Sequence, residues 1–331
     1  MRLENILALT HAKLVNEPFV NSFENVVLEV AKVKRGDLFI AFDPLDIPQA
    51  VLSGAYGIIF DKPTQISDSE IAWIKVHDTH DALLRLLRFR LIEKEPLVYE
   101  CNEIILKLAM QVMTESRFIA LHGDIKSVFK MLWHVEKNAV LLFCPALLSK
   151  DIFTNTKTLP KTAIEPIEVM EQTLFETSFI YDNTFYERQS ISPFFIPYLE
   201  ELLHLYKTLK INFRLRKFTP IEHFEAVFVN KNFEIKEFGT SDKVIIFEPN
   251  TALIEKEMKF LQKYARWAKT IYLLPHAMAH EAAENIFFYE KEEQIVPMLQ
   301  NKQFHFALLV GVDKSILSKP ITQPIQLTLE F

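Results

Sequence analysis

Short hydrophobic runs alternate with amphipathic stretches along the first half of the chain. Runs rich in branched and aromatic residues fit buried strands, and apolar residues three and four positions apart fit helices. This alternation predicts an α/β layer structure. Strands are expected over residues 24–30, 38–42, 56–60, 71–76, 117–121 and 139–143. Helices are expected within residues 1–19 and over residues 47–53, 80–93, 101–115 and 128–135.

The second half continues the alternation after a gap. Residues 149–190 are polar, rich in Thr and Pro, and carry no clear periodicity. Residues 193–209 have strong helical spacing, and residues 211–217 alternate as a half-buried strand does. Further on, the pattern predicts a hairpin over residues 224–238, strands over 244–247, 271–274, 304–310 and 325–331, and helices over 253–268 and 280–287.

The composition is that of a folded protein without a basic surface. A length of 331 residues predicts two domains, and Pro96 marks the expected boundary between residues 1–96 and 97–331. The hydrophobic fraction of 49% excludes a disordered chain, and the 28 Phe predict an aromatic-rich core. A net charge of −6 argues against nucleic acid as the main partner, because phosphate binding favours a basic face.

Glycine is scarce, and this limits the nucleotide-binding motifs that the chain can contain. There are 6 Gly, where an average content of about 7% would give about 23. Loops that wrap phosphates closely need the positive φ angles that glycine adopts most readily. The sequence has no GxGxxG, so a dinucleotide-binding fingerprint is excluded.

The cysteines and the apolar runs indicate a cytoplasmic protein. Cys101 and Cys144 lie among apolar residues without a CxxC spacing, which predicts two buried thiols. The N-terminal residues include charges where a signal peptide needs an apolar stretch. The longest apolar run, about residues 139–148, is about half of a membrane span. We therefore expect no membrane span.

Three segments of the first domain resemble a known family. They are GDLFIA at residues 36–41, GA at residues 54–55, and VHDTHDAL at residues 76–83. In this order they resemble the UDP-binding N-terminal domain of the Mur ligases, closest to the MurF type that adds D-Ala-D-Ala to a UDP-MurNAc-peptide. The resemblance covers about residues 24–92. It implies a Mur-ligase-like N-terminal α/β domain.

The next segments resemble the central domain of the same family. RFIALHGDIKSVFKM is similar to its strand, P-loop and helix, which implies nucleotide binding by Gly123, Lys126 and Ser127. KVIIFEPN and TIYLLPHAMAH are similar to the strands that precede its metal ligands. The resemblance thus implies a metal site of Ser127, Glu248 and His280, with ATP and Mg²⁺ as cofactors if activity is retained.

Departures from the family pattern are concentrated at the sites of chemistry. The P-loop-like run is about two residues short, lacks the Gly before Lys126, and places Asp124 beside the phosphate position. The family's T-D-S-R segment, which contacts the nucleotide sugar, falls on residues 28–31 without the Arg or the hydroxyls. The loop at residues 43–46 is shortened, and we expect the family's third domain to be absent.

Each candidate residue also has a plain structural interpretation. Lys126 and Ser127 fit an exposed turn between a strand and a helix, and Glu248 fits a cap of the helix that follows. The basic segment 207–217 fits either an anionic partner or a solvated strand face. His276 and His280 have the spacing of metal ligands on a helix, but Pro275 favours a turn there.

The sequence as a whole predicts an α/β protein with a Mur-ligase-like N-terminal domain and a central-like domain with a degenerate P-loop. The predicted function is a non-catalytic binding or scaffold protein associated with peptidoglycan precursor synthesis. Its partners would be peptidoglycan-synthesis enzymes or UDP-muramyl precursors. An ATP-dependent amide ligase of the Mur type with an altered substrate is an alternative. A metal-dependent hydrolase that uses His276 and His280 is a more distant one.

Overall fold

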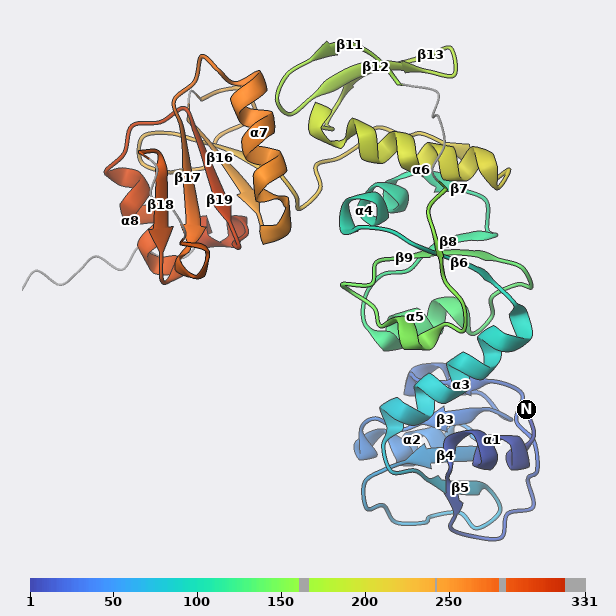
Figure 1. Cartoon of the computed structure of the whole chain (residues 1–331). Coiled ribbons are helices and arrows are strands. Elements are labelled where there is room, and N and C mark those ends of the chain that lie inside the picture. The colour runs from blue at the N-terminus through green and yellow to red at the C-terminus, as the bar shows by residue number, and fades with distance from the viewer. Residues whose placement is uncertain (161–166, 242, 280–283, 319–331) are drawn as a thin grey trace, which may run out of the picture. The chain divides into compact units, whose positions relative to one another are not determined.

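The chain folds into two compact units. The computed structural model describes residues 1–160, 167–241, 243–279 and 284–318 (Figure 1). The first unit contains residues 1–106, 114–160 and 209–213, and the second contains the remaining segments. The expected boundary after residue 96 falls inside the first unit, between its two sheets.

The N-terminal sheet has the strand order β1-β5-β4-β3-β2, and all of its strands are parallel except β1. Successive side chains of β3 point to opposite faces of the sheet. Leu38 and Ile40 pack into the core formed with α1 and α3, whereas Phe39 packs into the core formed with α2. Because helices cover both faces, the central strands β3 and β4 are buried throughout. The elements are α1 (Leu3–Thr10), β1 (Lys13–Leu14), β2 (Val26–Val27), β3 (Leu38–Ile40), α2 (Ile47–Leu52), β4 (Gly57–Phe60), β5 (Ala72–Lys75) and α3 (Thr79–Lys94).

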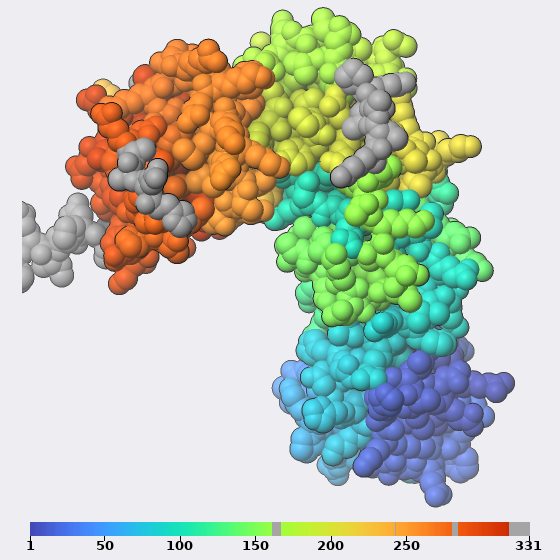
Figure 2. All heavy atoms as spheres, in the orientation of Figure 1, coloured from blue at the N-terminus to red at the C-terminus, as the bar shows by residue number. Residues whose placement is uncertain are grey.

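A second parallel sheet completes the first unit, with the order β10-β6-β9-β8. Its core residues Val98, Leu141 and Phe129 belong to the same hydrophobic cluster as α1 and α3. The two sheets therefore share one core, and α3 forms a continuous surface with the N-terminal residues in Figure 2. The elements are β6 (Leu97–Glu100), α4 (Glu103–Gln111), β8 (Phe118–Ala120), α5 (Ile125–Leu132), β9 (Val140–Phe143) and β10 (Lys157–Thr158).

Residues 168–189 of the polar region 149–190, whose sequence has no clear periodicity, form an antiparallel sheet of the second unit. It has the order β11-β12-β13 and is followed by the buried helix α6. All five residues of β11 are exposed, so its sequence lacks the alternation that identifies a strand. The elements are β11 (Glu168–Gln172), β12 (Thr177–Tyr181), β13 (Thr184–Gln189) and α6 (Ile196–Thr208).

The last sheet has the order β15-β16-β19-β17-β18, and only β15 is antiparallel to its neighbour. Helices α7 and α8 make its crossover connections (Figure 1). The elements are β15 (Glu225–Val229), β16 (Lys243–Glu248), α7 (Ile254–Tyr264), β17 (Thr270–Pro275), β18 (Ile286–Tyr289), α8 (Ile295–Gln300) and β19 (Phe306–Val310). The predicted α/β class is confirmed.

Several predicted elements differ from the structure. The strand expected over residues 24–30 is reduced to β2, and the helix expected over residues 101–115 ends at Gln111. The strand expected over residues 211–217 is reduced to β14 (Phe213–Arg214), because its partner β7 (Met113–Thr114) has only two residues. The second arm of the expected hairpin is reduced to a single bridge between Val229 and Ile235, and its first residue, Phe233, has a φ of 63°. Residues 286–287, expected in a helix, pair with β17 as part of β18. Residues 280–283 and the strand expected over 325–331 lie outside the described residues.

Two further expectations concern the thiols and the apolar segments. Cys101 and Cys144 are buried and form no disulfide, as predicted. Within the described ranges, none of the helices has both the length and the apolar character that crossing a bilayer requires.

Candidate functional site

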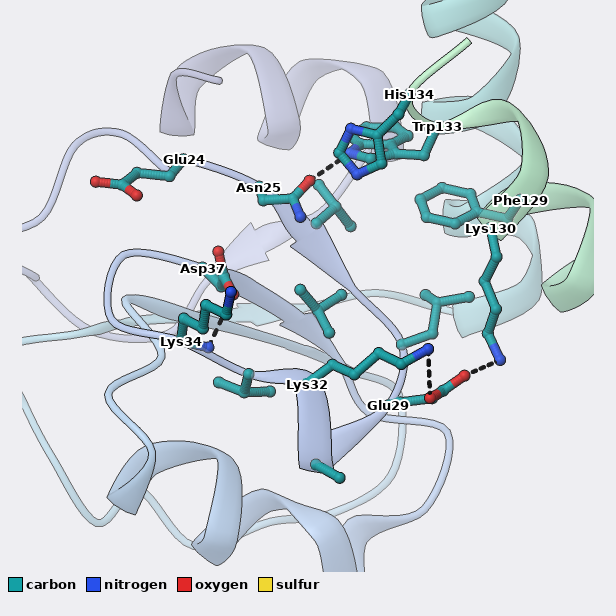
Figure 3. A pocket seen from close by; sticks show the side chains of 15 residues that line it. Glu24, Asn25, Glu29, Lys32, Lys34, Asp37, Phe129, Lys130, Trp133 and His134 are labelled. Carbon is teal, nitrogen blue, oxygen red and sulfur yellow. Dashed lines mark hydrogen bonds and ion pairs between the residues drawn. The ribbon is translucent and has the colours of Figure 1, made fainter. Parts of the chain in front are cut away.

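A groove of about 980 Å³ opens in the first unit (Figure 3). One wall is the segment that runs from β2 through the 3₁₀ turn η1 (Val30–Lys32), and the other is α5 with the residues that follow it. The lining residues are Glu24, Asn25, Val26, Val27, Leu28, Glu29, Ala31, Lys32, Val33, Lys34, Asp37, Phe129, Lys130, Trp133 and His134.

Two almost fully buried aromatic side chains lie beneath the α5 side of the groove. Phe129 and Trp133 are four residues apart, so they share a helix face, and their rings stack with centroids 4.7 Å apart. The indole Nε1 of Trp133 donates to Oδ1 of Asn25 at 2.8 Å. Because this bond joins the two walls, it holds the indole in a fixed orientation.

A cluster of three charges lies at one end of the groove. The carboxylate of Glu29 forms ion pairs with both Lys130 and Lys32, the latter at 2.9 Å. The hydrogen bond from Lys130, followed by that from Lys32, lowers the pKa of Glu29. Two ammonium groups share one carboxylate, so this end carries one excess positive charge.

The opposite end of the groove carries the carboxylates of Glu24 and Asp37 together with Lys34. Figure 3 shows Glu24 and Asp37 on the side away from Lys130. The buried Asp37 accepts from the backbone N–H of Lys34 at 2.9 Å, which fixes the turn that precedes β3. A groove with an apolar base and a cationic end suits an elongated ligand that carries an anionic group.

The predicted nucleotide-binding residues meet at the start of α5. Asp124 is the N-cap of this helix, and its carboxylate accepts from the backbone N–H of Ser127 at 2.9 Å and from the Ser127 hydroxyl at 2.6 Å. These two hydrogen bonds lower the pKa of Asp124. A carboxylate of the chain itself therefore occupies the N-terminal turn of the helix, where a phosphate is held in P-loop proteins.

Gly123 and Lys126 complete this turn. Gly123 has a φ of +82°, and a Cβ added there would lie 3.1 Å from Cβ of Ser127. The Nζ of Lys126 lies 3.7 Å from the ring centroid of Phe42, and that ring packs edge-on against His80. The structure thus brings Gly123, Lys126 and Ser127 together, with Asp124 and Phe42 as their immediate partners.

Glu248 lies in the second unit, at the end of β16, whereas Ser127 lies in the first. The Glu248 side chain is fully buried, and its Oε1 accepts from Nδ1 of His223 and from the backbone N–H of Asn250, both at 2.7 Å. Its Oε2 accepts from the backbone N–H of Phe224 at 3.1 Å. These contacts are those of a carboxylate that holds the backbone around the end of a strand.

A second carboxyl group adjoins Glu248 in the same core. Glu257 of α7 is fully buried, and burial together with the negative charge of Glu248 raises the pKa of Glu257 far above its usual range. The Glu257 side chain is therefore protonated at neutral pH. Sequence reasoning missed this cluster, because neither His223 nor Glu257 lies in a recognisable motif.

Of the two remaining metal candidates, His276 and His280, the structure describes only the first. His276 is exposed in a 3₁₀ turn after β17, and His280 lies outside the described residues. Across the described ranges, no group of three or more His, Cys, Asp or Glu side chains has the geometry to hold a metal ion.

Comparison with solved structures identifies the fold. A MurF structure from Acinetobacter baumannii matches with 11% sequence identity and a TM-score of 0.52, over 93% of this chain and 95% of that chain. A MurF ligase from Thermotoga maritima in complex with ADP matches with 13% identity and a TM-score of 0.49, over 88% and 95%. The chain has a Mur ligase-like fold. The predicted resemblance is thus confirmed at the level of fold.

Sequence comparisons add no family to this result. No protein-family model matches the chain, and no curated protein matches it in sequence. The match to the Acinetobacter MurF spans 95% of that chain, which is at odds with the expected absence of the family's third domain. The last sheet, β15 to β19, was assigned from sequence to a central-like domain, but it lies in a unit separate from the P-loop-like turn.

Proposed function

We propose that this protein is a non-catalytic, Mur-ligase-like binding protein that holds a UDP-muramyl precursor in the groove of the first unit. The observation that carries the proposal is the position of Asp124. Its carboxylate takes both the amide and the hydroxyl of Ser127 at the start of α5. In this arrangement the loop does not fit a triphosphate.

Electrostatics supports the absence of ATP binding at the start of α5. The lowered pKa of Asp124 keeps its carboxylate ionised at neutral pH, where it repels a phosphate brought to the same helix terminus. Lys126, the cation that would approach the phosphates, lies over the ring of Phe42. For a ligase reaction to proceed, the Asp124 carboxylate would have to release Ser127, and the Lys126 ammonium would have to leave the Phe42 ring and contact ATP.

The groove supports the binding part of the proposal. Its excess positive charge at Lys32 and Lys130 suits the phosphates of a nucleotide sugar, and the buried rings of Phe129 and Trp133 form the apolar base beneath. None of these four side chains belongs to the turn at Asp124. Precursor binding therefore does not depend on ATP. Peptidoglycan-synthesis enzymes are the partners that such a precursor carrier would meet.

Calorimetric titration with UDP-MurNAc-tripeptide tests the groove. We expect saturable binding, and we expect the double variant Lys32→Ala/Lys130→Ala to weaken it at least tenfold, because two charge-assisted contacts are lost. Lys259→Ala, on the exposed side of α7 in the second unit, is the matched control and keeps the wild-type affinity.

Two outcomes contradict this part of the proposal. Absence of binding to the folded wild-type protein removes the precursor as the ligand. Equal affinity of the wild type and the double variant shows that the precursor binds elsewhere.

A further inference from the structure

The second unit contains an apolar pocket of about 500 Å³ that the proposed function does not use. It is bounded by the β11–β12 turn, the start of β16, the end of α7 and the start of β19. None of the side chains that line it is charged. They are Gln172, Thr173, Leu174, Phe175, Phe228, Phe238, Gly239, Ser241, Val244, Tyr264, Trp267 and Phe306.

Aromatic rings make up most of the pocket surface. Phe175 lies at the centre, with ring centroids 6.2 Å from Phe228 and 6.1 Å from Phe306. At the rim, Trp267 is 73% exposed and Phe238 is 53% exposed. Contiguous exposed rings of this size mark binding surfaces in soluble proteins, because their hydration is unfavourable.

The pocket is preformed by the turn that carries Phe175. The Thr173 hydroxyl accepts from the backbone N–H of Phe175 at 3.2 Å and from that of Glu176 at 2.9 Å. The Ser192 hydroxyl donates to the carbonyl of Leu174 at 2.7 Å. A turn held at three points presents its ring without a conformational cost on binding.

Basic residues flank Trp267 in the sequence. Lys263, at the end of α7, and Arg266 and Lys269, which follow that helix, are exposed, and none of them has an ion pair within the described ranges. The Nζ of Lys263 lies 4.8 Å from the ring centroid of Tyr264. Elsewhere, Glu176, Glu237 and Lys243 adjoin lining residues in the sequence.

We propose that this pocket binds a peptide segment that inserts one aromatic side chain between Phe175 and Trp267 and places acidic residues against the cations that flank Trp267 in the sequence. The ring matches the apolar concavity, and the carboxylates match the unpaired cations. A concave pocket of this volume accommodates a discrete side chain, whereas a membrane surface requires a projecting apolar face. The inference goes beyond the precursor groove and does not depend on it.

Nuclear magnetic resonance of the indole N–H groups tests the pocket directly. The chain has 3 Trp, and Trp73 and Trp133 are buried while Trp267 is exposed. Titration with acetyl-Asp-Asp-Phe-Ser-Ser-amide is expected to shift the Trp267 signal saturably and to leave the other two unchanged. The probes acetyl-Asp-Asp-Ala-Ser-Ser-amide and acetyl-Lys-Lys-Phe-Ser-Ser-amide are expected to bind at least tenfold more weakly.

Variants separate the ring contribution from the charge contribution. Phe238→Ala and Arg266→Glu are each expected to weaken binding of the acidic peptide about tenfold, since each removes one of the two recognition elements. Phe185→Ala, an exposed ring on β13, and Lys75→Glu, an exposed cation of the first unit, are matched controls that keep the affinity.

Three results overturn the proposal. The first is that the Trp267 signal does not respond to acetyl-Asp-Asp-Phe-Ser-Ser-amide. The second is that acetyl-Asp-Asp-Ala-Ser-Ser-amide binds as tightly as that peptide. The third is that phosphatidylglycerol vesicles shift the Trp267 signal while the peptide does not. The last result assigns the surface to a membrane.

Discussion

Glu257 shows how a single buried side chain links the stability of the second unit to pH. Its carboxyl group is fully buried on α7 beside Glu248, which in turn holds His223. In the unfolded chain the Glu257 carboxyl ionises above its ordinary pKa of 4.5, whereas in the folded chain it stays protonated. The folded state therefore holds one more proton, and stability falls as the pH rises above that value.

We expect Glu257→Gln to remove this pH dependence. From about pH 5 to pH 8 the unfolding free energy of the wild type falls, relative to the variant, by up to about 1.4 kcal/mol per pH unit. Urea denaturation at several pH values measures the difference. Parallel pH profiles for the two proteins would show that Glu257 ionises normally in the fold.

The turn before α5 is the element on which the functional argument depends. Four residues with distinct roles are compressed into it: Gly123 supplies a positive φ, Asp124 caps the helix, Lys126 packs on Phe42, and Ser127 closes the turn. The pattern predicted the helix from residue 128, but the cap at Asp124 starts it at Ile125. In the proposed function, the Asp124 side chain takes the place of an external anion at this turn.

Substitution of Gly123 tests the geometry of this turn. Gly123→Ala is expected to destabilise the first unit by about 1–2 kcal/mol, because Ala is strained at positive φ, with a further loss from the contact with Ser127. Gly239→Ala is the matched control, since Gly239 has a φ of +76° with no atom within 4 Å of the added Cβ. Equal losses in thermal unfolding would show that the Ser127 contact is unimportant.

The strands that could be predicted from the sequence are those that helices cover on both faces of a sheet. Strands β3, β4 and β9 are buried throughout, so each appears as an uninterrupted apolar run. Strand β18 was missed because pairing with β17 overrides the local preference of its residues. The exposed β11 has no apolar pattern to find.

Only those parts of the candidate site whose residues are close together in the sequence could be predicted. The P-loop-like motif placed Gly123, Lys126 and Ser127 in one turn, as the structure has them. The groove depends on contacts such as Trp133 with Asn25, which are 108 residues apart. No spacing or motif signals such a contact, because it follows from how the sheets share a core.

The whole molecule has a Mur ligase-like fold, and the match to the Acinetobacter MurF covers 93% of the chain. In the proposed function, the P-loop-like turn before α5 is filled by the carboxylate of Asp124 in place of a phosphate. In this account the groove and the aromatic pocket are binding surfaces that persist without ATP-driven ligation.

Calorimetric titration of the wild-type protein with ATP in the presence of Mg²⁺ tests the central claim most directly. UDP-MurNAc-tripeptide, titrated into the same preparation, shows whether the protein is competent to bind. The account predicts no saturable heat with ATP up to millimolar concentrations, because Asp124 holds the amide of Ser127. Saturable, Mg²⁺-dependent binding of ATP that Lys126→Ala abolishes would contradict the account and support an active ligase.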